Sequence, residues 1–151
     1  MNACELIAIV LTGLVTGVFF GPWLGLSRSI DQFSPQTFLA IGKRMIGNLR
    51  PVMPVLMPLA ILSVVAAAVV LRPASVCGFW LTIAGLIFFL CALLITLIVE
   101  VPIDNQIRRW TLETMPAEWE EIRDRWERFH ALRTFASIVA FVLVTAGAVF
   151  R

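Results

Sequence analysis

Four long apolar runs constrain this chain more than any other feature of its sequence. They cover about residues 6–26, 52–71, 77–99 and 134–150. A helix of about 20 apolar residues can cross the roughly 30 Å hydrocarbon core of a bilayer, because it satisfies its own backbone hydrogen bonds. The runs therefore predict an all-α fold: a single domain over residues 1–151 that forms an integral membrane four-helix bundle, with a polar helical extension preceding the fourth span.

The composition agrees with a lipid solvent. Hydrophobic residues make up 60% of the chain, charged residues 15%, and the mean hydropathy is +0.92. The formal charge of +2 is dispersed, which excludes the basic stripe of a nucleic-acid-binding protein. Only Ser, Thr and Cys supply polar side chains inside the runs, which counts against an ion-coupled transporter. Because Glu5 rather than a basic stretch precedes the first run, we expect a retained span and not a signal peptide.

The loop charges predict the orientation in the membrane. The long loops, residues 27–51 and 100–133, contain ten basic residues between them: Arg28, Lys43, Arg44 and Arg50, then Arg108, Arg109, Arg123, Arg125, Arg128 and Arg133. The opposite side has only Arg72 and Arg151. Because basic loops favour the inside, we expect both long loops in the cytoplasm and both termini outside a bacterial cell membrane.

Small residues and cysteines leave two alternatives open. Gly13, Gly17 and Gly21 lie on one helix face and permit close helix contact, either within the bundle or between the subunits of a homo-oligomer. Cys4 and Cys77 fall on the same side of the membrane. They form either a disulfide, if that side is oxidising, or two inert thiols.

The segment "AEWEEIRDRWERFHALRTF", residues 117–135, is the most polar part of the chain. Pro116 and Glu118 suit a helix start, and the helix is expected to continue into the fourth apolar run. At about 100° per residue one face carries Trp119, Arg123, Trp126, His130 and Arg133. This face fits either an interfacial anchor with arginines reaching lipid phosphates, or a pocket that stacks a flat aromatic molecule and holds its oxygen with guanidinium groups.

A second polar cluster, "EVPIDNQIRRW", spans residues 100–110. Glu100 and Asp104 share a helix face if the helix persists, although Pro102 predicts a break or kink. With Asn105, Arg108 and Trp110 they are candidates to face the first cluster. The alternative is a helix-end turn in which Glu100 pairs with a nearby arginine.

These two motifs and the final apolar run resemble the closing half of the anthrone oxygenase-like membrane protein family, many members of which are known only as a domain of unknown function. The match is strong over about a third of the chain and extends to the rest only through the four-span layout. The family's marked positions fall on Pro102, Trp110, Trp119, Arg123, Arg125, Trp126, His130 and Arg133. In one departure, Asp104 stands where the family commonly has asparagine, and Asn105 follows it.

The resemblance implies oxygenation of polyketide anthrones to anthraquinones by O2 with no metal or flavin, so no cofactor is expected. A base removes a proton from the activated methylene, and the electron-rich anion then passes an electron to O2. The catalytic candidates are His130 as the base and Asp104. The substrate-binding candidates are Trp110, Trp119, Arg123, Trp126, Arg133 and Asn105, with the arginines holding the oxyanion and Trp119 and Trp126 as walls.

The single histidine excludes haem ligation by two histidines and a three-nitrogen metal site within one chain. A different class of function also fits the sequence: a non-catalytic membrane bundle that binds a protein partner or a lipophilic ligand. The expected partners are the lipid bilayer, a lipophilic aromatic substrate and O2.

Overall fold

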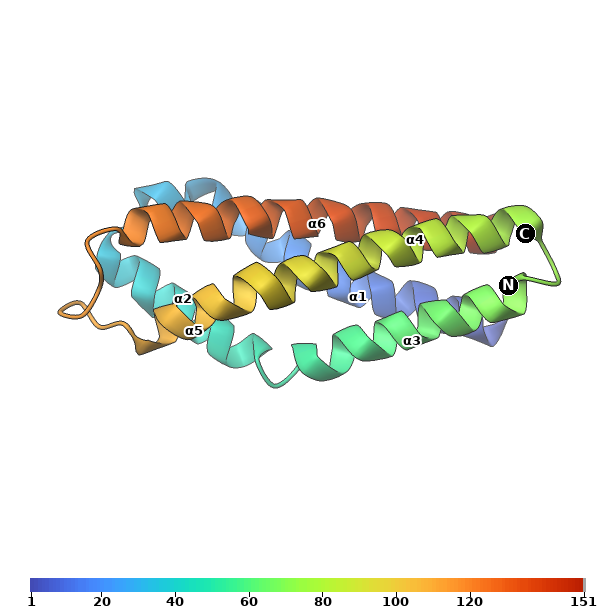
Figure 1. The fold of residues 1–151 in the computed structure, drawn as a ribbon, viewed down its shortest axis with the longest axis horizontal. Coiled ribbons are helices and arrows are strands. Elements are labelled where there is room, and N and C mark those ends of the chain that lie inside the picture. The colour runs from blue at the N-terminus through green and yellow to red at the C-terminus, as the bar shows by residue number, and fades with distance from the viewer. Residues whose placement is uncertain (151) are drawn as a thin grey trace.

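The computed structural model describes residues 1–150, and all of their regular structure is helical (Figure 1). The elements in chain order are α1 (Ala3–Gly25), the 3₁₀ helix η1 (Ser27–Gln32), α2 (Pro35–Leu49), α3 (Met53–Leu71), α4 (Val76–Ile95), the π-helical segment η2 (Thr96–Glu100), α5 (Val101–Arg109) and α6 (Trp119–Val149). Four of the helical rods are long and apolar enough to cross a membrane. The predicted all-α membrane bundle is confirmed.

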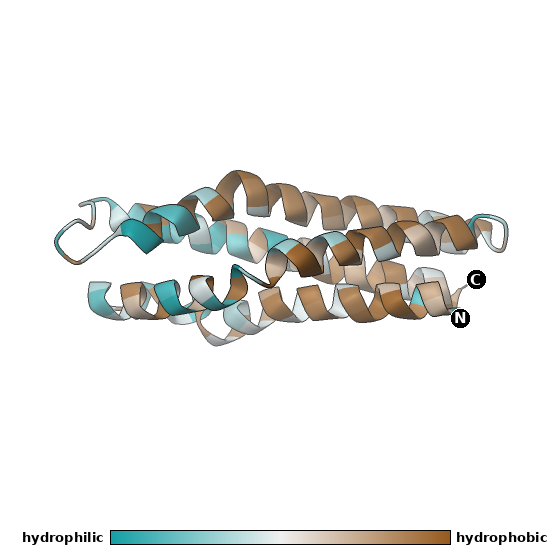
Figure 2. Cartoon of the chain, turned by 90° about the horizontal axis from the view of Figure 1, so that it is seen from below, coloured by the Kyte–Doolittle hydropathy of each residue, from teal (hydrophilic) through white to brown (hydrophobic). Residues whose placement is uncertain are grey.

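The two ends of the bundle differ in polarity. Both termini and the α3–α4 turn lie at one end, where the helices are apolar (Figures 1 and 2). At the other end lie α2, α5 and the first turns of α6, which are largely hydrophilic (Figure 2). Both predicted long loops therefore lie at one end of the bundle, whereas their cytoplasmic location stays a prediction.

Both long loops are mostly helical rather than irregular. In the first, the Ser34 hydroxyl accepts a hydrogen bond from the Thr37 backbone N–H, and Pro35 takes the first position of α2. This is the usual chemistry of a helix start. The second loop consists of α5, a connection, and the beginning of α6, which runs without a break into the fourth span as predicted.

Of the break or kink predicted at Pro102, the break is wrong. The rod continues from α4 through η2 into α5, as residues 76–109. In η2 the Val101 N–H bonds to the Thr96 carbonyl, five residues back, so Pro102 becomes a first-turn residue of α5. The wider π-helical turn before it accommodates a residue that has no N–H to donate to the preceding turn. Glu100 and Asp104 consequently lie on one continuous rod.

The most extensive helix contact is between α4 and α6, and it depends on glycines. A Cβ atom added at Gly85 would lie 2.9 Å from the Val144 side chain, and one added at Gly78 would lie 2.7 Å from the Gly147 carbonyl oxygen. The glycine face predicted on α1 contributes less, since Gly13 alone meets a neighbour, the Phe141 ring. Nothing described lies within 4 Å of the Cβ positions of Gly17 and Gly21, and Cys4 and Cys77 are free.

Candidate functional site

The polar face predicted on α6 points into the protein. Its members are Trp119, which is half-buried, and the buried Arg123, Trp126, His130 and Arg133. The opposite face of the same turns is exposed: Glu121, Asp124, Arg125 and Arg128. An interfacial anchor would turn its tryptophans and arginines outward, so the burial favours a role inside the protein.

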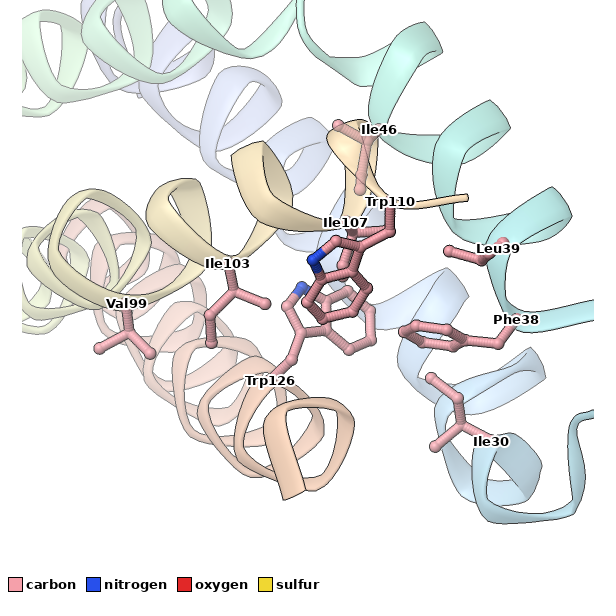
Figure 3. Close-up of a cluster of buried hydrophobic side chains, with 9 residues drawn as sticks. All are labelled: Ile30, Phe38, Leu39, Ile46, Val99, Ile103, Ile107, Trp110 and Trp126. Atoms are coloured by element: carbon pink, nitrogen blue, oxygen red, sulfur yellow. The ribbon is translucent and has the colours of Figure 1, made fainter. Parts of the chain in front are cut away.

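The part of this face nearest the polar end of the bundle packs into an apolar cluster between α2, α5 and α6 (Figure 3). Trp119 stacks at a tilt on Phe38, with ring centroids 5.5 Å apart, and the Arg123 guanidinium lies 5.2 Å from the Trp119 ring centroid. Trp110 is buried in the same cluster, and Lys43 Nζ donates to its backbone carbonyl. Trp110 and Trp119 thus join helices together, whereas Arg123 contacts Trp119 and pairs with Asp124 on the same helix. None of these three predicted site residues lines the cavity described next.

A cavity of about 350 Å³ lies deeper, between α1, the α2–α3 junction, α5 and α6. It is lined by five of the predicted site residues: Asp104, Asn105, Trp126, His130 and Arg133. The apolar part of its wall includes Val18, Phe19 and Met53. Small-molecule sites have this character, with a mostly apolar lining and a few convergent polar groups. The wall from α1 was missed by the sequence analysis, because Val18 and Phe19 carry no signal that separates them from ordinary core residues.

Arg133 is the most connected side chain in the site. Its Nη2 lies 2.9 Å from Glu100 Oε2, and its Nε donates to His130 Nδ1 over 3.1 Å. Its Nη1 donates to the Thr96 hydroxyl over 3.3 Å, and its guanidinium carbon lies 4.6 Å from the Phe19 ring centroid. These contacts fix the guanidinium plane and balance its charge, as a buried arginine requires.

Glu100 was not among the candidate site residues. The sequence left open whether it faces the polar segment of α6 or pairs with a nearby arginine in a helix-end turn. Its pairing with an arginine is confirmed, although it lies inside a continuous rod and not in a helix-end turn. The side chain is 0% exposed, and Oε1 has no hydrogen-bond partner among residues 1–150. The π-helical segment turns this carboxylate toward α6, in keeping with the frequent occurrence of π-bulges at functional sites.

The contacts of His130 define its protonation. An arginine has no acceptor, so Nδ1 must accept the hydrogen bond from Arg133, and the ring is neutral with its proton on Nε2. The imidazole stacks on Trp126, with centroids 5.1 Å apart and an interplanar angle of 5°. Nε2 is buried and has no hydrogen-bond partner among residues 1–150. His130 therefore lines the cavity with one N–H donor still unused.

Asp104 is the carboxylate at the cavity wall. Its Oδ1 accepts a hydrogen bond of 3.1 Å from the Trp126 indole N–H, and the side chain is half-buried. Asn105 follows it on the exposed side of the same wall. A carboxylate held by one neutral donor beside an aromatic surface is suited to accept a proton from a bound molecule. Residues 1–150 contain no group of three or more His, Cys, Asp or Glu side chains that is arranged to hold a metal ion.

Comparison with known proteins shows which family this chain resembles. Residues 45–143, more than half of the 151-residue chain, match the family described as anthrone oxygenase. The matched segment includes Glu100, Asp104, Trp126, His130 and Arg133, whereas the α1 part of the cavity wall lies outside it. No curated protein and no solved structure matches the chain. The shared family segment and the four apolar helices together place this chain in the anthrone oxygenase family, as an integral membrane protein.

Proposed function

We propose that the cavity binds a lipophilic, fused-ring aromatic or quinol-like compound and oxidises it with O2 at the membrane interface. The observation that carries this proposal is the cavity of about 350 Å³, which combines an apolar wall with Asp104, Trp126, His130 and Arg133. The flat Trp126–His130 stack offers a surface for an aromatic ring. The polar groups lie at the same wall, where they meet the reacting part of the molecule.

The proposed reaction converts an activated methylene and O2 into a carbonyl and water. Asp104 takes one proton from the methylene, and the electron pair that is left spreads into the ring system and its oxygen. One electron passes to O2, the two radicals combine to a peroxide anion, and the proton held by Asp104 returns to it to give a hydroperoxide. Loss of water, with H from the C–H bond and OH from the O–OH bond, then leaves the C=O group. Atoms and electrons balance with O2 as the only oxidant.

The contacts of the two catalytic candidates support different roles for them. The Nδ1 lone pair of His130 is already occupied by Arg133, so His130 is a poor proton acceptor in this arrangement. Asp104 takes the base role, and the His130 Nε2–H stabilises the negative charge that develops on the substrate oxygen. Such fixed donors are worth most in a site that excludes water. Arg133 holds His130 in this tautomer, with Glu100 balancing its charge.

The test uses the purified full-length protein in lipid nanodiscs with an anthrone and O2, and follows O2 uptake together with quinone absorbance. We expect turnover above that of empty nanodiscs, and a rate lowered by about a hundredfold or more in Asp104→Asn, because a positioned base contributes that much. Asp31→Asn is the matched control, since Asp31 is an exposed acid on η1, outside the cavity. Substrate binding without any O2 uptake would overturn the catalytic proposal and support the non-catalytic bundle.

A further inference from the structure

We infer that the cavity takes an aromatic substrate with one anionic substituent, a carboxylate or an ionised phenol, and that Arg50 and Arg108 bind this substituent at the cavity mouth. The inference rests on the proposed function, because it names the substrate class of the same cavity. Neither arginine takes part in the proposed chemistry.

The cavity lining separates into an inner and an outer part. The inner part is formed by the buried Phe19, Trp126, His130 and Arg133. The outer part consists of exposed residues: Arg50, Pro54, Leu97, Val101, Asn105 and Arg108. The cavity therefore opens on the side of the bundle where the α2–α3 junction lies opposite the rod formed by η2 and α5.

The residues at this mouth change from apolar to cationic along the rod. Leu97 and Val101 are exposed apolar residues of the span, and Arg108 follows in the last turn of α5. At a rise of about 1.5 Å per residue, Arg108 lies roughly 16 Å along the axis from Leu97 and about 6 Å beyond Asp104. Across the mouth, Arg50 lies in the turn between α2 and α3, four residues before Pro54. The mouth is thus apolar toward the bilayer and cationic toward the polar end of the bundle.

The charges at the mouth favour an anion. Among residues 1–150 neither Arg50 nor Arg108 forms an ion pair or a side-chain hydrogen bond, whereas Arg133 is neutralised by Glu100. Guanidinium groups bind carboxylates and phenolates through paired N–H donors. An amphipathic aromatic that enters from the bilayer would place its rings on Trp126 and His130 and leave its anionic group between the two free arginines.

The test measures binding to the full chain in phosphatidylcholine nanodiscs without O2, so that no turnover is needed. The probes are anthracene-2-carboxylate and the neutral anthracene-2-methanol, followed by energy transfer from tryptophan. In Arg50→Gln/Arg108→Gln we expect affinity for the carboxylate to fall by about tenfold or more, as loss of charge-assisted hydrogen bonds predicts, and affinity for the alcohol to stay within about twofold. Arg109→Gln is the matched control, because Arg109 is exposed beside Arg108 and does not line the cavity.

Three results would overturn the inference. An equal loss of affinity for both probes would mean that the arginines affect the shape of the mouth but do not distinguish an anionic ligand from a neutral one. An equal loss in Arg109→Gln would mean that only the general surface charge matters. An unchanged carboxylate affinity in the double variant would assign the arginines to lipid headgroups. Failure of the proposed function is a separate result: the carboxylate preference would then be present while O2 uptake with the anthrone is absent.

Discussion

The rod of α4, η2 and α5 meets α6 in two regions of opposite character. Toward the termini the two helices touch backbone to backbone, at Gly78, Gly85 and Gly147. Toward the polar end they are separated by large side chains, among them Glu100, His130 and Arg133, with the cavity beside them. The buried polar side chain at the first region is the hydroxyl of Thr82, which donates to the Gly78 carbonyl of its own helix, whereas the second region holds a buried ion pair.

The difference shows how one helix pair can pack closely at one end and leave space for a cavity at the other. Glycines let the backbones approach closely at one end, and this close approach strengthens the van der Waals packing between the membrane helices. At the other end the π-helical segment and the bulky polar residues hold the helices apart. We infer that the glycine contact provides the fixed end from which the helices diverge to make the cavity. The three predictions below test this division, from the largest expected effect to the smallest.

The largest effect is expected from breaking the buried ion pair. Glu100→Leu leaves the Arg133 guanidinium buried without its acid, and Arg133→Met leaves Glu100 in the same position. Each single change should lower the free energy of unfolding by about 3–5 kcal/mol, because an uncompensated buried charge is costly. Denaturant titration in mixed micelles, followed by circular dichroism, measures this free energy.

The double variant Glu100→Leu/Arg133→Met is the control for that prediction. It removes both charges, so its loss of stability should be clearly smaller than the sum of the two single losses. Additive losses would show that the polar region is held by packing alone. The contrast with the glycine region would then be one of shape and not of charge.

A smaller effect is expected from filling the glycine contact. In Gly147→Ala the added Cβ would lie 2.8 Å from the Gly78 carbonyl oxygen, a backbone atom that cannot move aside. Overpacking of this kind costs about 1–3 kcal/mol, which should appear as a lower free energy of unfolding in the same titration. The cavity should also change, because the helices pivot on this contact. Binding of the anthracene probes reports that change.

Gly17→Ala is the matched control for Gly147→Ala. Gly17 is also a helical glycine of a span, but nothing described lies within 4 Å of its Cβ position. Alanine has the higher helix propensity, so this variant should be as stable as the parent chain or slightly more so. Equal destabilisation by both changes would remove the special role of the α4–α6 contact.

Local patterns predicted much of the fold and the direction of the polar face. Apolar run length gave the four spans, and the helical period placed Trp126, His130 and Arg133 on one buried face. Both signals depend on residues a few positions apart. The break expected at Pro102 was also a local inference, and it failed because η2 shifts the hydrogen bonding next to the proline and the helix continues.

Depth along the helix could not be predicted from the sequence. Trp119 and Arg123 share a face with Trp126 and His130, yet the first two pack against α2 and only the second two reach the cavity. The helical period gives a direction around the axis and says nothing about which partner lies opposite each turn. That depends on where α2 packs and on the crossing of α1, which brings Phe19 beneath Arg133.

The smallest effect is expected from Trp126→Phe, which separates ring packing from hydrogen bonding in the polar region. The substitution keeps an aromatic ring against His130 but removes the N–H that donates to Asp104. We expect a loss of about 0.5–1.5 kcal/mol in the free energy of unfolding, the usual contribution of one hydrogen bond. Trp80→Phe, at an exposed position on α4, should change it far less. If the two losses were equal, the bond to Asp104 would add nothing, and this wall of the cavity would be held by apolar packing, as the glycine region is.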